Sequence, residues 1–261
     1  MQSLNDLDIK TKISLLLLGV SGTGKTSLLL QFPKPFILNC DDNLNGPVKF
    51  LKRQGVDLSD VTFATPIYEE DGTPVPREEW FKRSGNLLSQ AGQSDCETII
   101  VDSLTTFTDF VLIEVLRLQG RTIGDVFLSD KRSKLADSQM QQQDWGAFFN
   151  AMKALIMQLK SWDKNIVFTG HTKTREDSAT NALYNSIACP GQTADLIAGF
   201  FEEVWLLKSS IKGSGSTAKE KRTIQTFPAS NMNTGLGLKS PSGLPSGSDL
   251  DPEVALKYLF G

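Results

Sequence analysis

A glycine-rich segment near the N-terminus constrains the fold of this chain more than any other feature. Residues 19–26 read Gly-Val-Ser-Gly-Thr-Gly-Lys-Thr, which fits the pattern G-x-x-x-x-G-K-[ST] of a phosphate-binding P-loop, or Walker A motif. An apolar run, 13–18, precedes the glycines, and a second run suited to a helix, 27–32, follows them. The segment therefore predicts a strand, a tight phosphate-binding loop and a helix in direct succession.

The residue types within this loop have physical reasons. Glycines let the backbone turn tightly and point its N–H groups at phosphate oxygens, and the positive end of the following helix adds attraction. We expect Lys25 to reach the β- and γ-phosphates and the Thr26 hydroxyl to bind Mg²⁺. The predicted nucleotide-binding residues of the segment are Gly19, Ser21, Gly22, Thr23, Gly24, Lys25, Thr26 and Ser27.

Strand-like and helix-like segments alternate along the chain, which is typical of βαβ units around a mostly parallel sheet. Strands are expected at 12–18, 35–40, 61–64, 98–103 and 165–170, and helices at 46–54, 77–90, 107–118 and 143–162. We expect an antiparallel hairpin from 202–207 and 222–227 and a polar loop over 172–194. This pattern predicts one α/β domain over 1–239, followed by a flexible segment and a short C-terminal helix over 240–261.

Composition narrows the class of protein. Hydrophobic residues make up 39% of the 261 residues and charged residues 22%, as in soluble globular proteins. No apolar run approaches the ~20 residues that span a bilayer, and the polar first twelve residues are unlike a signal peptide. Three widely spaced cysteines favour a reducing compartment, so we expect a cytoplasmic protein with no membrane partner. A net charge of −3 does not indicate a broad nucleic-acid surface but is compatible with a local basic groove.

Polar residues end three of the predicted strands, at the sheet edge where open α/β folds bind ligands. Asp102 closes a wholly apolar strand and suits a Walker B aspartate, which holds Mg²⁺. Asp41 and Asp42 end the second strand, and either could activate water, with Asp41 favoured, or the pair could only cap the next helix. His171 could sense the γ-phosphate and report its loss to the following loop, or it could be structural.

The order of these segments resembles the RecA-type recombinase core. The similarity rests on the P-loop, Asn39-Cys40-Asp41-Asp42, Ile100-Val101-Asp102-Ser103 and Val167-Phe168-Thr169-Gly170-His171. It implies ATP as the nucleotide, Asp41 in the place of the usual glutamate base and His171 in the place of the usual glutamine sensor. The expected catalytic residues are Lys25, Asp41, Asp102 and His171, with Thr26 and Asp102 holding Mg²⁺.

Within that group, the chain is most similar to the small phage-encoded RecA-like ATP-binding proteins implicated in single-strand annealing and recombination. Supporting segments are 32–36, 143–146, 170–172 and 200–204, and the similarity covers about residues 12–245. It implies a homo-oligomer, a ring or a filament, with ATP at the subunit interface, in the cytoplasm of a bacterial host cell. Single-stranded DNA is the expected partner, and a single-strand-binding protein is a further candidate.

One departure from the family concerns a pair of cations near the C-terminal strand. RecA-type ATPases and hexameric helicases often carry Lys-x-Lys or Lys-x-Arg there, reaching the γ-phosphate of a neighbouring subunit. This sequence keeps Lys239 but has Pro241 in place of the second cation. We therefore expect Lys239 to bind nucleotide, together with either weak intersubunit catalysis or another cation in the second place.

The two DNA-binding loops of RecA-type proteins correspond to 120–139 and 172–192. The predicted DNA-binding residues are Arg121, Lys131, Arg132, Lys134, Lys173, Arg175 and Tyr184. The predicted hairpin tip adds Lys212, Lys219, Lys221 and Arg222. Cations beside an aromatic ring suit single strands, although the same residues could form solvated loops. The resemblance favours a DNA-stimulated ATPase that promotes annealing and recombination. There are two alternatives: a hexameric helicase-like motor, and a nucleotide-gated DNA-binding module with negligible turnover.

Overall fold

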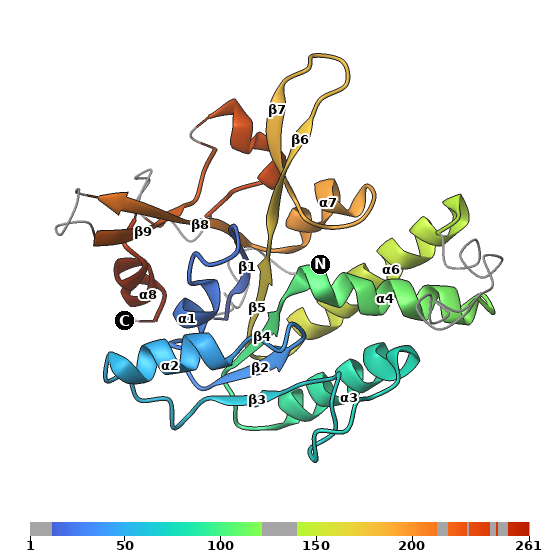
Figure 1. The fold of residues 1–261 in the computed structure, drawn as a ribbon, viewed down its shortest axis with the longest axis horizontal. Helices are drawn as coiled ribbons and strands as arrows, with labels where there is room; N and C mark the ends of the chain where they lie inside the picture. The colour runs from blue at the N-terminus through green and yellow to red at the C-terminus, as the bar shows by residue number, and fades with distance from the viewer. Residues whose placement is uncertain are drawn as a thin grey trace, which may run out of the picture.

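A seven-stranded sheet forms the centre of the molecule in the computed structural model, which describes residues 12–121, 140–212, 219–228, 230–240, 244 and 250–260. The strand order is β3-β2-β4-β5-β1-β8-β9. Its strands are β1 (Ser14–Leu18), β2 (Pro35–Asn39), β3 (Thr62–Ala64), β4 (Thr98–Asp102), β5 (Asn165–Gly170), β8 (Glu203–Lys212) and β9 (Lys219–Gln225). Neighbouring strands pair in parallel except β8 and β9, which form an antiparallel hairpin (Figure 1).

Burial on both faces explains the sequences of the central strands. All five residues of β1 and all five of β4 are buried, and neither strand alternates between apolar and polar side chains. A parallel strand covered by helices on both sides has no solvent face and needs no such alternation. The edge strand β3 is exposed at two of its three residues, and so the apolar runs mark the strands nearest the middle of the sheet.

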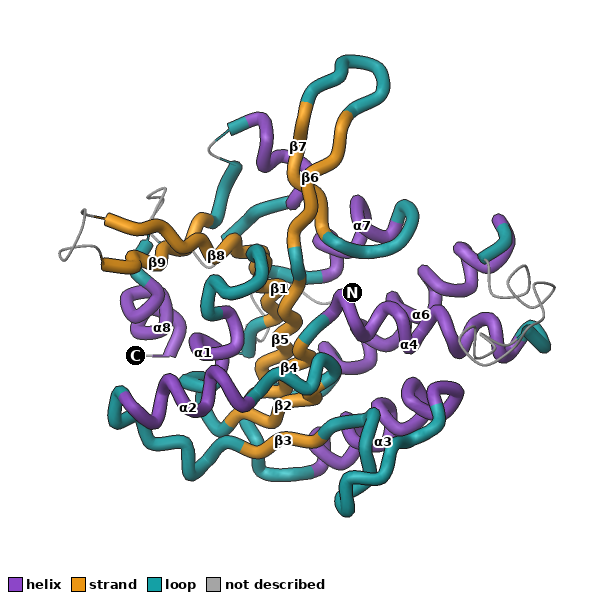
Figure 2. Tube along the Cα trace, viewed as in Figure 1, coloured by secondary structure: helices purple, strands orange, loops and turns teal. Residues whose placement is uncertain are grey.

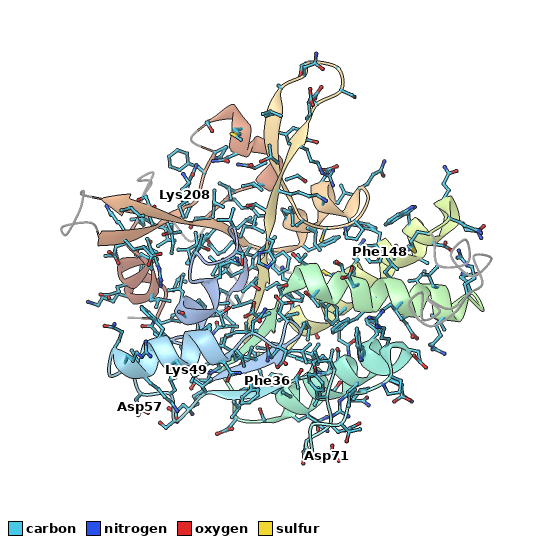
Figure 3. The ribbon with its side chains drawn as sticks, in the orientation of Figure 1. Phe36, Lys49, Asp57, Asp71, Phe148 and Lys208 are labelled. Carbon is cyan, nitrogen blue, oxygen red and sulfur yellow. The ribbon has the colours of Figure 1, made fainter. Side chains whose placement is uncertain are left out.

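Helices cover both faces of this sheet (Figure 2). One layer holds α1 (Lys25–Leu29), α2 (Asn45–Arg53) and α8 (Pro252–Phe260), which share a hydrophobic cluster with one face of the central strands. The other layer holds α3 (Trp80–Gln93), preceded by η2 (Arg77–Glu79), and α4 (Leu104–Leu118) and α6 (Gln142–Lys160). Figure 3 labels Phe148, fully buried on α6, and Lys49 on α2 of the opposite layer. The predicted fold class, a mostly parallel α/β sheet with a C-terminal antiparallel hairpin, is confirmed.

The C-terminal helix packs on the sheet. Ala255 of α8 is fully buried, and the rings of Phe260 and Phe32 meet edge to face with centroids 5.0 Å apart. Leu250, just before the helix, pairs with Ile224 of β9. The short final helix was correctly predicted, whereas the boundary placed at residue 240 stays a prediction.

The prediction of a polar loop over 172–194 was wrong. The structure has an antiparallel hairpin, β6 (Thr172–Glu176) and β7 (Leu183–Ile187), followed by α7 (Thr193–Leu196), η3 (Ile197–Phe200) and, after β9, η5 (Asn231–Leu236). The side chain of Asp177 accepts hydrogen bonds from the backbone N–H groups of Ala179 and Thr180, which forms the turn. Polar residues here mark a two-stranded ribbon whose first strand is mostly exposed, and polarity alone does not distinguish such a ribbon from a loop.

Two further observations bear on what the chain can do. Helix α4 begins three residues earlier than predicted because the Ser103 hydroxyl caps it, accepting a hydrogen bond from the backbone N–H of Thr106. Among the described residues, no helix is long and apolar enough to cross a membrane.

Candidate nucleotide-binding site

The P-loop connects β1 directly to α1, as its sequence predicts. Gly22 and Gly24 have φ angles of 81° and 88°, in the left-handed region that glycine tolerates best. A Cβ on Gly19 would lie 2.7 Å from the carbonyl oxygen of Leu207 on β8. The first glycine therefore allows close packing on the sheet, and the later two allow the loop to turn.

Lys25 is buried and bound by the carbonyl oxygens of its own loop. Its Nζ donates hydrogen bonds to Gly19 at 2.9 Å and Val20 at 3.1 Å, and lies 3.5 Å from Nδ1 of His171. Burial lowers the pKa of Lys25, against the opposing attraction of Asp102 and Asp41. A desolvated ammonium held by weak neutral acceptors gains most from a polyanion placed in the same loop.

Asp102 ends β4 and holds two hydroxyl groups. Its Oδ2 accepts a hydrogen bond from Thr26 at 2.7 Å, and its Oδ1 accepts one from Thr169 of β5. Burial raises the pKa of Asp102, and the hydrogen bonds from Thr169 and Thr26 oppose that shift. The P-loop threonine and the strand-ending aspartate thus meet at one point, as a Walker A and Walker B pair must.

Asp41 and Asp42 occupy different environments. Asp41 accepts a hydrogen bond from the Ser103 hydroxyl at 3.1 Å and lines the cavity over the P-loop. Asp42 is exposed, has a φ of 53° and does not line that cavity. Of the two carboxylates, only Asp41 is therefore positioned to act on a group bound at the P-loop.

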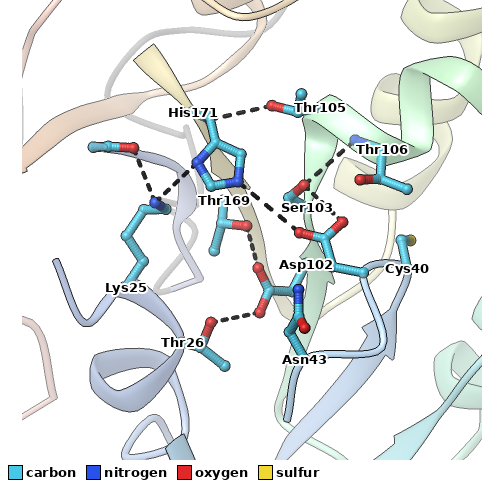
Figure 4. A network of polar contacts seen from close by, with 12 residues as sticks. Lys25, Thr26, Cys40, Asn43, Asp102, Ser103, Thr105, Thr106, Thr169 and His171 are labelled. Atoms are coloured by element: carbon cyan, nitrogen blue, oxygen red, sulfur yellow. Dashed lines mark hydrogen bonds and ion pairs between the residues drawn. The ribbon is translucent and has the colours of Figure 1, made fainter. Parts of the chain in front are cut away.

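His171 follows β5, and its imidazole points toward Lys25 (Figure 4). Its Nε2 is 4.0 Å from Oδ2 of Asp41, and its backbone N–H donates to the Thr105 hydroxyl at 3.2 Å. Burial and the Lys25 ammonium lower the pKa of His171, so the imidazole is neutral at pH 7. In the tautomer with its hydrogen on Nε2, Nδ1 can accept from Lys25 and the Nε2–H faces Asp41.

These side chains surround a cavity of about 510 Å³. Its lining includes six of the eight predicted P-loop residues: Ser21, Gly22, Gly24, Lys25, Thr26 and Ser27. Thr23 is buried instead, and its hydroxyl donates to the Val20 carbonyl at 3.0 Å, which braces the loop. Lys239 is not among the lining residues; its backbone pairs with Val204 of β8.

The oxygen atoms near the P-loop suit Mg²⁺ shared with a nucleotide. Thr26 and Asp102 offer one hydroxyl and one carboxylate at a single point. Within the described ranges, no cluster of three or more His, Cys, Asp or Glu side chains could hold a metal ion alone. Mg²⁺ commonly binds one or two carboxylates and completes its shell with substrate phosphates and water, and the residues present fit that mode.

The predicted DNA-binding residues fall into three groups. Lys131, Arg132 and Lys134 lie outside the described residues. Arg121 forms an ion pair at 2.6 Å with the fully buried Asp144, so its charge faces the protein interior. Lys173 and Arg175 lie two residues apart on β6, and Arg175 pairs in register with Tyr184 of β7.

Sequence reasoning missed several side chains of the site, among them Asn43 and Pro47, which line the cavity. Thr169 and Ser103 are polar residues at the ends of apolar strands, and that signal could have found them. Phe50 of α2 and Arg222 of β9 also line the P-loop cavity. Arg222 was expected at the hairpin tip, but the pairing of β9 with β8 places it beside Gly24 instead. No local pattern marks those two, because distant segments bring them to the loop.

Comparison with known proteins agrees with this geometry. A family model described as an AAA domain matches residues 11–235. The chain belongs to this AAA domain family. It is therefore a P-loop ATPase, and the predicted nucleotide class is supported at that level. No curated protein matches the chain.

Two solved structures are similar to this AAA domain chain over much of its length. A KaiC-like protein, PH0186, from Pyrococcus horikoshii OT3 shares 10% identity, with 82% of this chain and 77% of that chain covered and a TM-score of 0.37. An ATPase from the type III secretion system of pathogenic bacteria shares 13% identity, with 75% and 52% covered and a TM-score of 0.40. At these scores, neither likeness carries an argument about substrates or partners.

Proposed function

We propose that this P-loop ATPase binds and hydrolyses ATP with Mg²⁺ and uses the nucleotide to control its binding of single-stranded DNA during strand annealing and recombination. One observation carries the proposal. Lys25, Asp41, Asp102 and His171 meet in one cavity, and His171 is followed directly by the β6–β7 hairpin. The setting, a phage-infected bacterial cell, rests on the sequence resemblance alone.

Binding of the polyphosphate uses groups that are already aimed at the cavity. The turn of the P-loop and the first turn of α1 present backbone N–H groups to the phosphates. Lys25 would give up its hydrogen bonds to the carbonyl oxygens of Gly19 and Val20 and bind the β- and γ-phosphates instead. Thr26 and Asp102 would hold Mg²⁺, which supplies neutralisation of phosphate charge when bound. Thr169 fixes the Asp102 carboxylate from the side away from Thr26.

Hydrolysis needs a base beside the γ-phosphate, and Asp41 takes that role in our proposal. The Ser103 hydroxyl holds one carboxylate oxygen, and the other faces the imidazole of His171. A water molecule between Asp41 and the phosphate would give its proton to the carboxylate as it attacks. Because an aspartate is one methylene shorter than glutamate, we expect turnover to be slow.

Coupling to DNA would pass through His171. A γ-phosphate that attracts the Lys25 ammonium would remove the hydrogen-bond partner of Nδ1 of His171. The Nε2–H of the same ring could then turn from Asp41 to a phosphate oxygen. The backbone of His171 is tied to Thr105 of α4, and the next residue, Thr172, begins β6. A small rotation of the histidine would therefore be transmitted to the base of the hairpin.

The β6–β7 hairpin is the proposed contact with single-stranded DNA. Lys173 and Arg175 share one face of β6 because side chains two apart on a strand point the same way. Tyr184 lies opposite Arg175, so a cation and an aromatic ring adjoin. Phosphates would pair with the cations while bases stack on the ring.

A homo-oligomer is part of the same proposal. Lys239 lies on the β8 side of the sheet and does not line the cavity of its own chain. In a ring or filament, this cation would serve the nucleotide of a neighbouring subunit, which places ATP at the interface.

Mg²⁺-dependent ATP hydrolysis, measured with and without single-stranded DNA, tests the proposal. We expect stimulation by single strands and no activity in Lys25→Ala. DNA binding that depends on ATP without measurable turnover would replace the enzyme by a nucleotide-gated binding module. An absence of DNA binding in every nucleotide state would remove the recombination function and leave an ATPase with another partner.

A further inference from the structure

A cavity on another part of the molecule lies between the start of α6 and the segment that contains α7. Its walls come from residues 142–149 on one side and 191–196 on the other. Its volume of about 520 Å³ falls in the range of about 300–1,000 Å³ that is usual for ligand pockets. This cavity and the one over the P-loop have no lining residue in common, so it needs an explanation of its own.

Two aromatic side chains of α6 line this cavity, and each ring is packed against a second segment. Trp145 and Phe149 are both half-buried. A Cβ on Gly191 would lie 3.0 Å from the ring of Trp145, and the ring of Phe149 lies 5.6 Å from that of Phe200, measured between centroids. Rings that are partly exposed and already fixed lose little conformational freedom when a flat group stacks on them.

A glycine keeps the space beside these rings open. Gly146 lies inside α6 and lines the cavity, although glycine weakens a helix relative to alanine. A Cβ added at this position would meet no heavy atom within 4 Å. A larger side chain here would therefore extend into open space, and the glycine leaves that space free.

The polar groups of the cavity are neutral. Gln142 and Gln192 stand on opposite walls, and each amide can both donate and accept hydrogen bonds. Among the residues that the structure describes, no charged side chain lines this space. Aromatic rings together with amides and without charge suit a flat, neutral group that carries donors and acceptors on its edge. A nucleobase has this chemistry, because its faces stack on aromatic rings and its edge forms hydrogen bonds.

The cavity also adjoins the hairpin that carries the predicted DNA-binding cations. In Figure 1, α7 lies between the β6–β7 hairpin and α6. Lys173 of β6 is exposed, and its Nζ donates a hydrogen bond at 3.4 Å to the carbonyl oxygen of Cys189. Cys189 precedes by two residues Gly191, which lines the cavity. A phosphate bound at this lysine would thus lie beside the entrance for an adjoining base.

We propose that the cavity between α6 and α7 binds one unpaired base of a single strand whose backbone contacts Lys173. This inference rests on the proposed function and deepens it, because it assigns a base-binding subsite to two helical segments beyond the hairpin. Trp145 and Phe149 stack on the base, and the two glutamine amides bind its edge. A base inside a duplex is paired and stacked and does not enter, so the subsite selects single strands over duplex DNA.

Two labelled oligonucleotides of equal length test the inference, one with normal bases and one in which every site is abasic. Their affinities are measured by fluorescence anisotropy with ATP and Mg²⁺ and again without nucleotide. Wild-type protein should bind the normal strand more tightly. Gly146→Leu fills the cavity and should weaken binding of the normal strand about tenfold, with the abasic strand unchanged. Trp145→Ala should have the same effect, and circular dichroism checks that both variants are folded.

Gly85→Leu is the matched control. Gly85 is also a helical glycine, on α3, with no heavy atom within 4 Å of an added Cβ, and it does not line this cavity. This variant should bind both strands as wild type does. Equal affinity of wild-type protein for the two strands would overturn the base subsite while DNA binding stands. Gly146→Leu that binds both strands normally would also overturn it and leave the cavity to another occupant, such as a side chain of a protein partner. Binding of neither strand in any nucleotide state would refute the proposed function itself.

Discussion

The Nζ of Lys25 lies 3.5 Å from Nδ1 of His171, so the P-loop lysine and the residue that ends β5 share a contact. The lysine enters from α1 and the histidine from the junction of β5 and β6. Because the lysine is also the residue that a phosphate attracts most strongly, filling the loop must change the surroundings of the histidine. Binding and signalling would thereby use the same ammonium group.

Replacing Lys25 by methionine should abolish nucleotide binding without weakening the fold. Burial lowers the pKa of this lysine, so at pH 7 its ammonium group is less stable in the folded protein than in the unfolded chain. Methionine removes that cost, and the unfolding free energy of the variant should therefore equal or exceed that of the wild type. Thermal unfolding with and without ATP and Mg²⁺ measures both effects. At a hundredfold excess over Kd, wild-type protein should gain about 2.7 kcal/mol and the variant nothing. A variant that unfolds earlier without nucleotide would contradict this account.

Asp102→Asn should reduce hydrolysis at least a hundredfold because the amide loses the negative charge expected to hold Mg²⁺. Steady-state turnover measured over a range of Mg²⁺ concentrations checks this expectation. Asp163→Asn is the control, since Asp163 is exposed and lies outside the cavity. Equal turnover in the two variants would remove Asp102 from the metal site.

The stability of the protein should depend on pH through His171. Its pKa is lowered from 6.5 by burial and by Lys25, so the unfolded chain binds a proton more readily than the folded one. Stability from this group is fully present above pH 6.5 and is lost as the pH falls toward the lowered value. Urea unfolding from pH 5 to pH 7.5 should therefore show a smaller decline in His171→Gln than in wild type; parallel curves would rule the histidine out as the cause.

His171→Ala should separate nucleotide binding from its effect on DNA. The variant keeps Lys25, Thr26 and Asp102, so ATP affinity should stay within about threefold, while the difference in DNA affinity with and without ATP should vanish. Fluorescence anisotropy of a labelled oligonucleotide gives both values. An unchanged dependence of DNA binding on nucleotide would mean that another residue carries the signal.

Substitution of the hairpin residues should weaken DNA binding in two distinguishable ways. Arg175→Ala should reduce the slope of log affinity against log salt by about one, whereas Tyr184→Ala should lower affinity about tenfold with little change in slope. Lys153→Ala, an exposed cation on α6, controls for net charge. If all three variants bind alike, the hairpin is not the DNA surface.

Much of the fold was readable from the sequence because its central strands are buried on both faces. The run Thr98–Asp102 and the run Asn165–Gly170 have no solvent side, so their apolar stretches and terminal polar residues stand out. Each strand ends at the same edge, and so the sequence alone predicts that Asp102 and His171 share one site.

The remaining features depend on contacts between distant segments. Arg222 reaches the P-loop only because β9 folds back on β8, and Phe50 reaches it from α2. The β6–β7 hairpin has a mostly exposed first strand, and only the end of β7 is buried, so its polar residues resemble a loop. The positions of Arg222 and Phe50 and the structure of the hairpin depend on contacts between distant segments, which no local sequence pattern reveals.

The position of β1 in the sheet has a consequence for synthesis of the protein on the ribosome. Leu15 pairs with Val167 on one side and Glu203 on the other, so both neighbours of the first strand are made late. Contacts between residues so far apart in sequence form slowly, since long loops must close first. The nascent P-loop therefore has no sheet to anchor it until most of the polypeptide has left the exit tunnel. Premature termination before β8 would leave β1 without one of the two strands that pair with it.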